Sequence, residues 1–295
     1  MIDLSLLAPP AIIDALGFET ILAELKADAI ARLPELADLL ELESEPVTAL
    51  LQAVAYRELL LRQRINEASK AVMLAYAAGA DLDQIGANYG IPRLVLTPGD
   101  PEAIPPIDDV MEADTDFRTR ILLSLERFST AGSAASYEYH ARTASAEVQD
   151  AAASSPAPGY VTVYVLAYEG NGTAPAELLA TVAEALDADT VRPMTDNVTV
   201  LSASIVTYTV QGHLVVSNGP DAETIRLAAV AACQAYVGSA RRLNQGASLS
   251  GIYQALHQPG VTRVQLASPL ADIVVAEGQA SHCLSITLTA GPEIG

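Results

Sequence analysis

PVTALLQAVAYRELLLRQRINEASKAVMLAYAAG, residues 46–79, is the stretch that decides the fold of this chain. Between its first and last residues it contains no proline or glycine, so the sequence predicts one uninterrupted helix. At about 1.5 Å per residue, that helix would be roughly 50 Å long. Pro46 suits a first helical turn, and Gly79 is predicted to end the helix.

Apolar residues in this stretch alternate three and four positions apart, which is typical of a helix that packs against other helices. The predicted seam consists of Leu51, Val54, Glu58, Leu61, Ile65, Ala68, Val72 and Ala75. A second apolar group, off this seam, comprises Tyr56, Leu59, Leu60, Ala71 and Leu74. Because two sides of the helix are apolar, we expect more than one neighbouring helix. The sequence therefore predicts a helix-bundle interface.

Glu58 is the one acidic residue in the predicted seam. It is either an edge residue whose carboxylate reaches water, or half of an ion pair that fixes the register of the bundle. Its partner would be Arg62, one turn further on, or an arginine of a neighbouring chain. Buried ion pairs favour specificity at a cost in stability.

The chain has 295 residues and a formal net charge of −20, with no tryptophan. An acidic chain without a long basic run is a poor candidate for nucleic-acid binding. Fourteen of its sixteen basic residues are arginine, the residue favoured in ion pairs and interfaces. The N-terminus has no basic segment typical of a signal peptide, so we expect synthesis in the cytoplasm. Cys233 and Cys283 show no metal-type spacing, and free thiols are expected.

The order of elements predicts an α+β fold. We expect an N-terminal helical region at 1–96, which includes a helix from about Ile12 to Arg32, and a Pro-rich acidic linker at 97–112. Small α+β layers follow, with paired strands and helices on one face, in a central domain at 113–200 and a C-terminal domain at 201–295. The prolines of the linker serve either a hinge or a stiff spacer.

No constellation in the sequence points to catalysis, a cofactor or a metal. The pairs Asp81/Asp83 and Asp114/Asp116 fall at predicted helix starts, where acidic residues act as caps. Four histidines lie in four separate elements, and adjacent side chains such as His282 and Cys283 face opposite ways along a strand. A nucleophile elbow of the form G-x-S-x-G does not occur.

Several segments, in order, resemble the baseplate J-like family of contractile phage tails and phage-tail-like bacteriocins. They are IDLSLL at 2–7, DALGFETILAE at 14–24, LESEP at 42–46, AYRELLLRQRINEASKAVMLAYAAGADLDQIGANYG at 55–90, MEADTDFRTRI at 111–121, AGSAASYEYHAR at 131–142, VRPMTDNVTV at 191–200 and SGIYQALHQPGVTRVQLASPLADIV at 250–274. The resemblance covers nearly the whole chain.

This resemblance implies a structural role. Members of the family form the wedges of a six-fold baseplate ring around the tail tube, which holds the sheath extended and triggers its contraction. Two copies join one smaller wedge protein of the tail protein I family through their long helices, and other baseplate and sheath proteins lie next to them. The resemblance implies no catalytic residues, and the virion is the expected location.

Two other classes are weighed against this role. A glycan hydrolase needs a cleft with a carboxylic acid of raised pKa, and the sequence offers no candidate for it. A host-binding fibre would show repetitive β-structure, which the order of helices followed by α+β layers contradicts.

Overall fold

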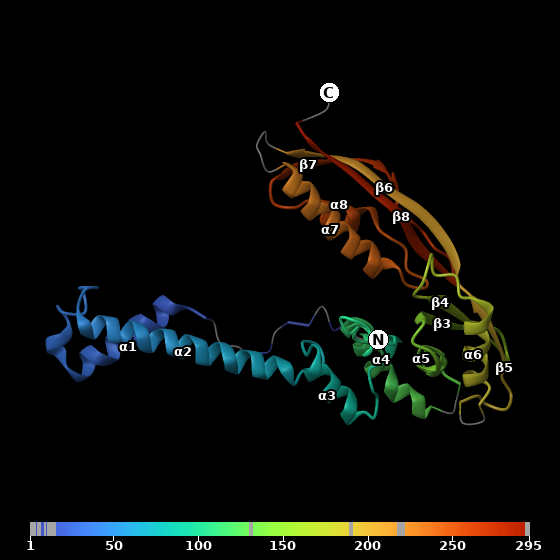
Figure 1. Ribbon diagram of the computed structural model, residues 1–295, viewed down its shortest axis with the longest axis horizontal. Helices are drawn as coiled ribbons and strands as arrows, with labels where there is room; N and C mark the ends of the chain where they lie inside the picture. Colours follow the sequence, from blue (N-terminus) through green and yellow to red (C-terminus); the bar gives the residue numbers. More distant parts are fainter. Residues whose placement is uncertain are drawn as a thin grey trace. The chain divides into compact units, whose positions relative to one another are not determined.

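The computed structural model describes residues 16–129, 132–188, 191–216 and 222–292, together with residues 4, 7, 8 and 10. Contacts divide the chain into two units, residues 1–93 and 94–295. Helices make up the described part of the first unit, and the second combines helices with three small sheets (Figure 1). The predicted α+β fold is confirmed. The three predicted boundaries between the four segments remain a prediction.

The first unit is built from α1 (Phe18–Arg32), a short 3-10 turn at Pro34–Leu36, α2 (Pro46–Ala71) and α3 (Ala80–Asn88). The part of the predicted first helix before Leu16 falls outside the described residues. Helices α1 and α2 pack side by side through a small apolar cluster, whose buried members are Ile21, Leu22 and Ala55.

The prediction of one helix from Pro46 to Gly79 is wrong at its C-terminal end. Helix α2 has 26 residues and ends at Ala71. The next bonds, from Met73 N to Lys70 O and from Tyr76 N to Met73 O, have the shorter spacing of turns. Burial of Ala77 and the hydrogen bond from Tyr76 Oη to Leu7 O (2.6 Å) stabilise this turn in place of another helical turn. Gly79 has φ +53° and directly precedes α3, which begins at Ala80.

The second unit begins with a ribbon that the sequence did not predict. Strands β1 (Val95–Thr97) and β2 (Val110–Met111) pair antiparallel, and a further bridge joins Asp100 to Ile107. The Pro-rich stretch therefore folds back on itself rather than lying extended. At Gly99 a Cβ would lie 2.2 Å from Ile107 O, so this close approach requires glycine.

The central layer contains the sheet β3-β4-β5, with β4 antiparallel to β3 and parallel to β5. Its strands span Val148–Ala157, Tyr160–Ala167 and Asn197–Ser202, and helices α4 (Asp114–Leu123), α5 (Ala134–Ala144) and α6 (Ala176–Leu186) accompany them, with a 3-10 turn at Ser124–Phe128. Alternating valines of β4 point into a core against α5 and α6, so Val163 and Val165 are fully buried.

The last layer is the sheet β7-β6-β8, in which β6 is antiparallel to β7 and parallel to β8. The strands span Val261–Ser268, Ser204–Val216 and Gln279–Gly291, and helices α7 (Ala222–Ala240) and α8 (Leu249–Leu256) lie along one face (Figure 1). Ser248 caps α8 by accepting a bond from Gly251 N at 3.1 Å. The expected arrangement of strands with helices on one face is present here.

Candidate interaction surfaces

Helix α2 buries a different stripe from the one that the spacing predicted. Its most buried residues, Thr48, Ala55 and Asn66, lie on the side that α1 covers. The predicted seam runs one position earlier, through Val54 and Ile65. One residue is 100° around a helix, so the predicted seam lies beside the contact with α1 rather than within it.

As a result, much of the predicted seam is uncovered in this chain. Val54 is 49 % exposed, Leu61 60 % and Ile65 49 %. Ala68 is exposed as well, while Leu51 is half-buried against α1. Val47, Leu50 and Val72 extend the same exposed stripe at three- and four-residue spacing. We call the residues Val47, Leu50, Val54, Leu61, Ile65, Ala68 and Val72 the α2 stripe.

The second predicted apolar group is divided by the fold. Leu59 packs on the cluster shared with α1. Tyr56 and Leu60 remain exposed, and the α1 contact separates them from the α2 stripe. Leu74 is half-buried and, like Val72, lies beyond the end of α2. Helix α1 therefore covers only one of the apolar sides of α2.

Glu58 accepts a hydrogen bond from Arg62 Nη2 at 2.5 Å, one turn further along α2. Both side chains are half-buried, and Arg62 Nη2 also lies 3.7 Å from Glu24 of α1. This pair joins the two helices at the edge of the α2 stripe. The Glu58 carboxylate and the Arg62 guanidinium therefore lie beside the exposed apolar residues of the α2 stripe.

A buried ionic network in the second unit has no counterpart in the sequence analysis. Asp116, expected to cap a helix, instead accepts hydrogen bonds from Arg242 and from the hydroxyl of Tyr168. Arg242 also donates to Gln149 O at 3.2 Å. Burial, followed by the hydrogen bond to Asp116, raises the pKa of Tyr168 above its ordinary value. The tyrosine therefore stays protonated and donates its hydrogen.

Asp150 forms the second centre of this network. Its carboxylate accepts from Arg142 of α5 and from Leu243 N, the latter at 2.9 Å. Nearby, Arg120 binds Glu112 through two hydrogen bonds of 2.7 and 3.0 Å. The partners lie in different elements, 8 to 126 residues apart, so no pattern within one element predicts these contacts. The only available signal was the predominance of arginine among the basic residues.

Metal binding and the reactivity of the cysteines were considered for the described part of the chain. Three or more His, Cys, Asp or Glu side chains do not gather there into a group that could hold a metal ion. Both cysteines are free, and burial raises the pKa of Cys233 to about 11, which disfavours the nucleophilic thiolate. Among the described helices, none combines the length and apolar character needed to cross a membrane.

Comparison with known proteins defines the class. The baseplate J-like N-terminal domain matches residues 43–100, and the baseplate J-like central domain matches residues 129–202. The chain is also similar to baseplate protein J of Escherichia phage P2, with 50 % identity over 296 residues, 99 % of this chain and 98 % of that protein. The chain therefore belongs to the baseplate J-like family.

Proposed function

We propose that this chain is a structural wedge subunit of a contractile-tail baseplate, either in a phage or in a phage-tail-like bacteriocin, and that it is not an enzyme. The full-length similarity to a phage baseplate protein supports the baseplate role. In this proposal the chain is made in the bacterial cytoplasm and built into the tail. There, copies form a six-fold ring around the tube that holds the sheath extended and triggers its contraction.

The observation that carries the proposal is the exposed α2 stripe. A helix of a monomeric protein places its apolar residues toward the core, yet Leu50, Leu61 and Val72 are 66, 60 and 75 % exposed. The three- and four-residue spacing fits the knobs-into-holes packing of another helix. The proposed occupants are α2 of a second copy and a helix of the smaller wedge protein of the tail protein I family.

Tyr56 and Leu60 form a second exposed apolar group on α2. Because this group lies on the other side of the α1 contact, one α2 can meet two further helices at once. This arrangement supports a bundle with more than two members. The Glu58–Arg62 pair, beside the α2 stripe, would then restrict which helix fits.

The test is co-expression of this chain with the neighbouring small baseplate protein, followed by native mass spectrometry. We expect a complex with two copies of this chain and one of the partner. Leu61→Glu places a charge in the α2 stripe and should abolish the complex, while Gln84→Glu adds the same charge at an exposed position of α3 and should preserve it. A wild-type chain that stays monomeric beside the partner would contradict the proposal.

A further inference from the structure

Strand β5 forms one edge of the central sheet, and no strand pairs with its outer side among the described residues (Figure 1). Its six residues, NVTVLS, include no charged residue and no proline. Such an edge is a template for another strand, because its outer N–H and C=O groups have no partner in the sheet. The opposite edge, β3, contains Pro156 and a break in register between Ser154 and Ala157, which oppose strand addition.

Hydrogen bonds to β4 define which backbone groups of β5 remain available. Asn197 N donates to Gly159 O and Ala203 N donates to Val165 O, both at 2.8 Å. In the parallel pairing of β5 with β4, every second residue bonds to the neighbouring strand, so the odd-numbered residues of β5 face β4. The N–H and C=O groups of the even-numbered residues, 198, 200 and 202, therefore point away from the sheet.

A groove of about 290 Å³ lies between β5 and α6. The side chains of Val198 and Val200 line it on the strand, and Ala183, Glu184 and Asp187 line it on the helix. Asp187 pairs with Arg192 at 2.9 Å but is 72 % exposed, and Glu184 has no ion pair among the described residues. The groove therefore combines an apolar strand surface with two accessible carboxylates.

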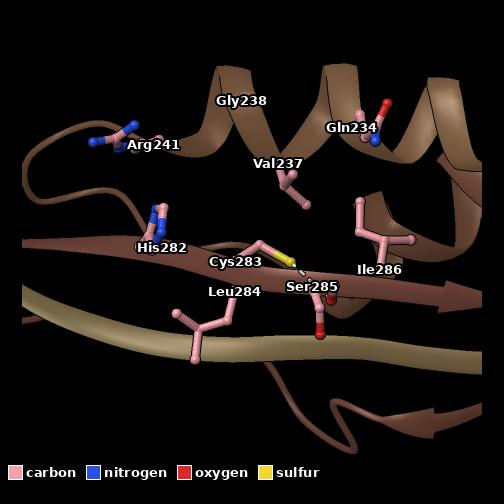
Figure 2. A pocket seen from close by; sticks show the side chains of 9 residues that line it. All are labelled: Gln234, Val237, Gly238, Arg241, His282, Cys283, Leu284, Ser285 and Ile286. Carbon is pink, nitrogen blue, oxygen red and sulfur yellow. Dashed lines mark hydrogen bonds between the residues drawn. The ribbon is translucent and has the colours of Figure 1, made fainter. Parts of the chain in front are cut away.

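The groove between α7 and β8 has the same volume and the opposite charge. Figure 2 shows Arg241 at one end of it, and none of its described lining residues is acidic. A basic side chain is therefore attracted to the groove beside β5 and repelled by the arginine of the groove in Figure 2.

We infer that the outer edge of β5 binds an extended basic segment of another protein, which joins the central sheet as a fourth strand. Main-chain hydrogen bonds to residues 198, 200 and 202 hold the segment. Its side chains alternate between the two faces of the sheet, so lysine or arginine at every second position reaches Glu184 and Asp187. This site lies in the central layer, separate from α2, and the inference goes beyond the proposed function.

This chain does not itself supply the basic segment. The residues outside the described part contain no lysine or arginine. In a second copy, the matching surface is β5 with its own acidic groove. Antiparallel pairing of two β5 strands would place both α6 helices on the same face and bring the carboxylates of the two grooves toward each other, and like charges repel. The charges therefore favour a different polypeptide.

The test uses two blocked peptides of six residues, the length of β5. One alternates threonine with lysine, and the other alternates threonine with glutamate. Amide exchange of the full chain is followed by NMR with each peptide. With the lysine peptide at about ten times its Kd, we expect the amides of 198, 200 and 202 to exchange about tenfold slower. The amides of 199 and 201 should change little, because they already bond to β4, and the glutamate peptide should protect none.

Two matched pairs of variants test the groove and the edge. Glu184→Lys turns an attraction into a repulsion and should weaken binding of the lysine peptide about tenfold. Glu147→Lys, the same change at an exposed position just before β3, should leave the Kd within about twofold. Val200→Pro removes an outward N–H that β4 does not use and should abolish the alternating protection, whereas Val200→Thr keeps this N–H and should retain it.

Absence of protection by the lysine peptide would overturn the inference, as would equal protection of odd and even amides or equal weakening by Glu184→Lys and Glu147→Lys. Protection that rises with the concentration of the chain alone would also overturn it, since the occupant would then be a second copy. Leu61→Glu separates the two proposals, because it should abolish the bundle of α2 and leave peptide binding at β5 unchanged.

Discussion

Arg242 donates a hydrogen bond to Asp116 across 126 residues of sequence, and so ties α4 to the loop that follows α7. Through Gln149 O, the same guanidinium also holds the start of β3. The next residue, Leu243, donates its backbone N–H to Asp150. Three parts of the second unit are therefore joined by polar contacts at one place, beside an apolar cluster that includes Leu166 and Ala280.

Removing Asp116 from its ion pair with Arg242 should destabilise the second unit strongly. Asp116→Ala leaves the Arg242 guanidinium and the Tyr168 hydroxyl without their acceptor in a largely buried position. Loss of one member of a buried ion pair typically costs 3–5 kcal/mol, and because Arg242 is 24 % exposed we expect about 3 kcal/mol. The free energy of unfolding in urea measures this change.

A matched control is the exposed pair Glu223–Arg226 on α7. Arg226→Gln removes a similar contact at the surface and should change the unfolding free energy far less than Asp116→Ala does. A double variant, Asp116→Ala with Arg242→Met, should recover part of the loss because no unpaired charge remains buried. Equal effects of Asp116→Ala and Arg226→Gln would show that the network adds no stability.

Two glycines of the last layer should respond to alanine in opposite directions. At Gly251 an added Cβ would lie 2.3 Å from the Tyr236 ring, so Gly251→Ala forces the ring away and should cost about 1–3 kcal/mol. At Gly238 the space is open and the backbone is helical, so Gly238→Ala should stabilise the helix by about 0.5–1 kcal/mol. Thermal unfolding followed by circular dichroism checks both signs. A stable Gly251→Ala protein would contradict this packing.

His140 should make the second unit sensitive to mild acid. Burial, together with the charge of Arg127, lowers the pKa of His140, and its Nε2 is buried without a hydrogen-bond partner. The unfolded state therefore binds a proton more readily than the folded state does. We expect the free energy of unfolding to fall as the pH drops below about 6.5 and through the lower pKa of the folded protein.

Denaturant titrations at pH 7.5 and pH 5.5 measure this effect. His140→Gln should reduce the difference between the two values, because its side chain does not titrate. His257→Gln is the control, since His257 lies in another layer, after α8. If both variants retain the full wild-type pH dependence, the acid sensitivity has another origin.

Sequence patterns were sufficient for elements that local signals define. The helix at 249–256 follows a capping serine, and the strand at 160–167 carries valines at a two-residue period, so both bear a local signal. The end of α2 at Ala71 was not predictable. Proline and glycine are absent there, and the contacts of Tyr76 and the burial of Ala77, both tertiary, favour the turn.

The side of α2 that faces α1 was also beyond sequence reasoning. Apolar residues occur on several sides of the helix, and spacing alone does not say which side a neighbour covers. The fold places α1 over Ala55 and leaves Leu61 and Ile65 exposed. The buried network around Asp116 depends on contacts between distant segments, so no local pattern indicates it.

Glu58 provides the sharpest test of how α2 chooses its neighbours. Glu58→Leu fills the gap in the apolar spacing of α2 and leaves Arg62 with Glu24, at 3.7 Å, as its nearest acidic group. Burial of a leucine in place of a charge should stabilise the assembled bundle by about 1–2 kcal/mol.

Without the Glu58 carboxylate, helices that lack a matching charge can also join the bundle. We therefore expect native mass spectra to show mixed stoichiometries with the small partner. Glu177→Leu removes the same charge from an exposed position of α6, in the second unit, and should keep a single stoichiometry. One unchanged complex in Glu58→Leu would identify Glu58 as an edge residue. The exposed apolar spacing of α2 alone would then account for the choice of partner.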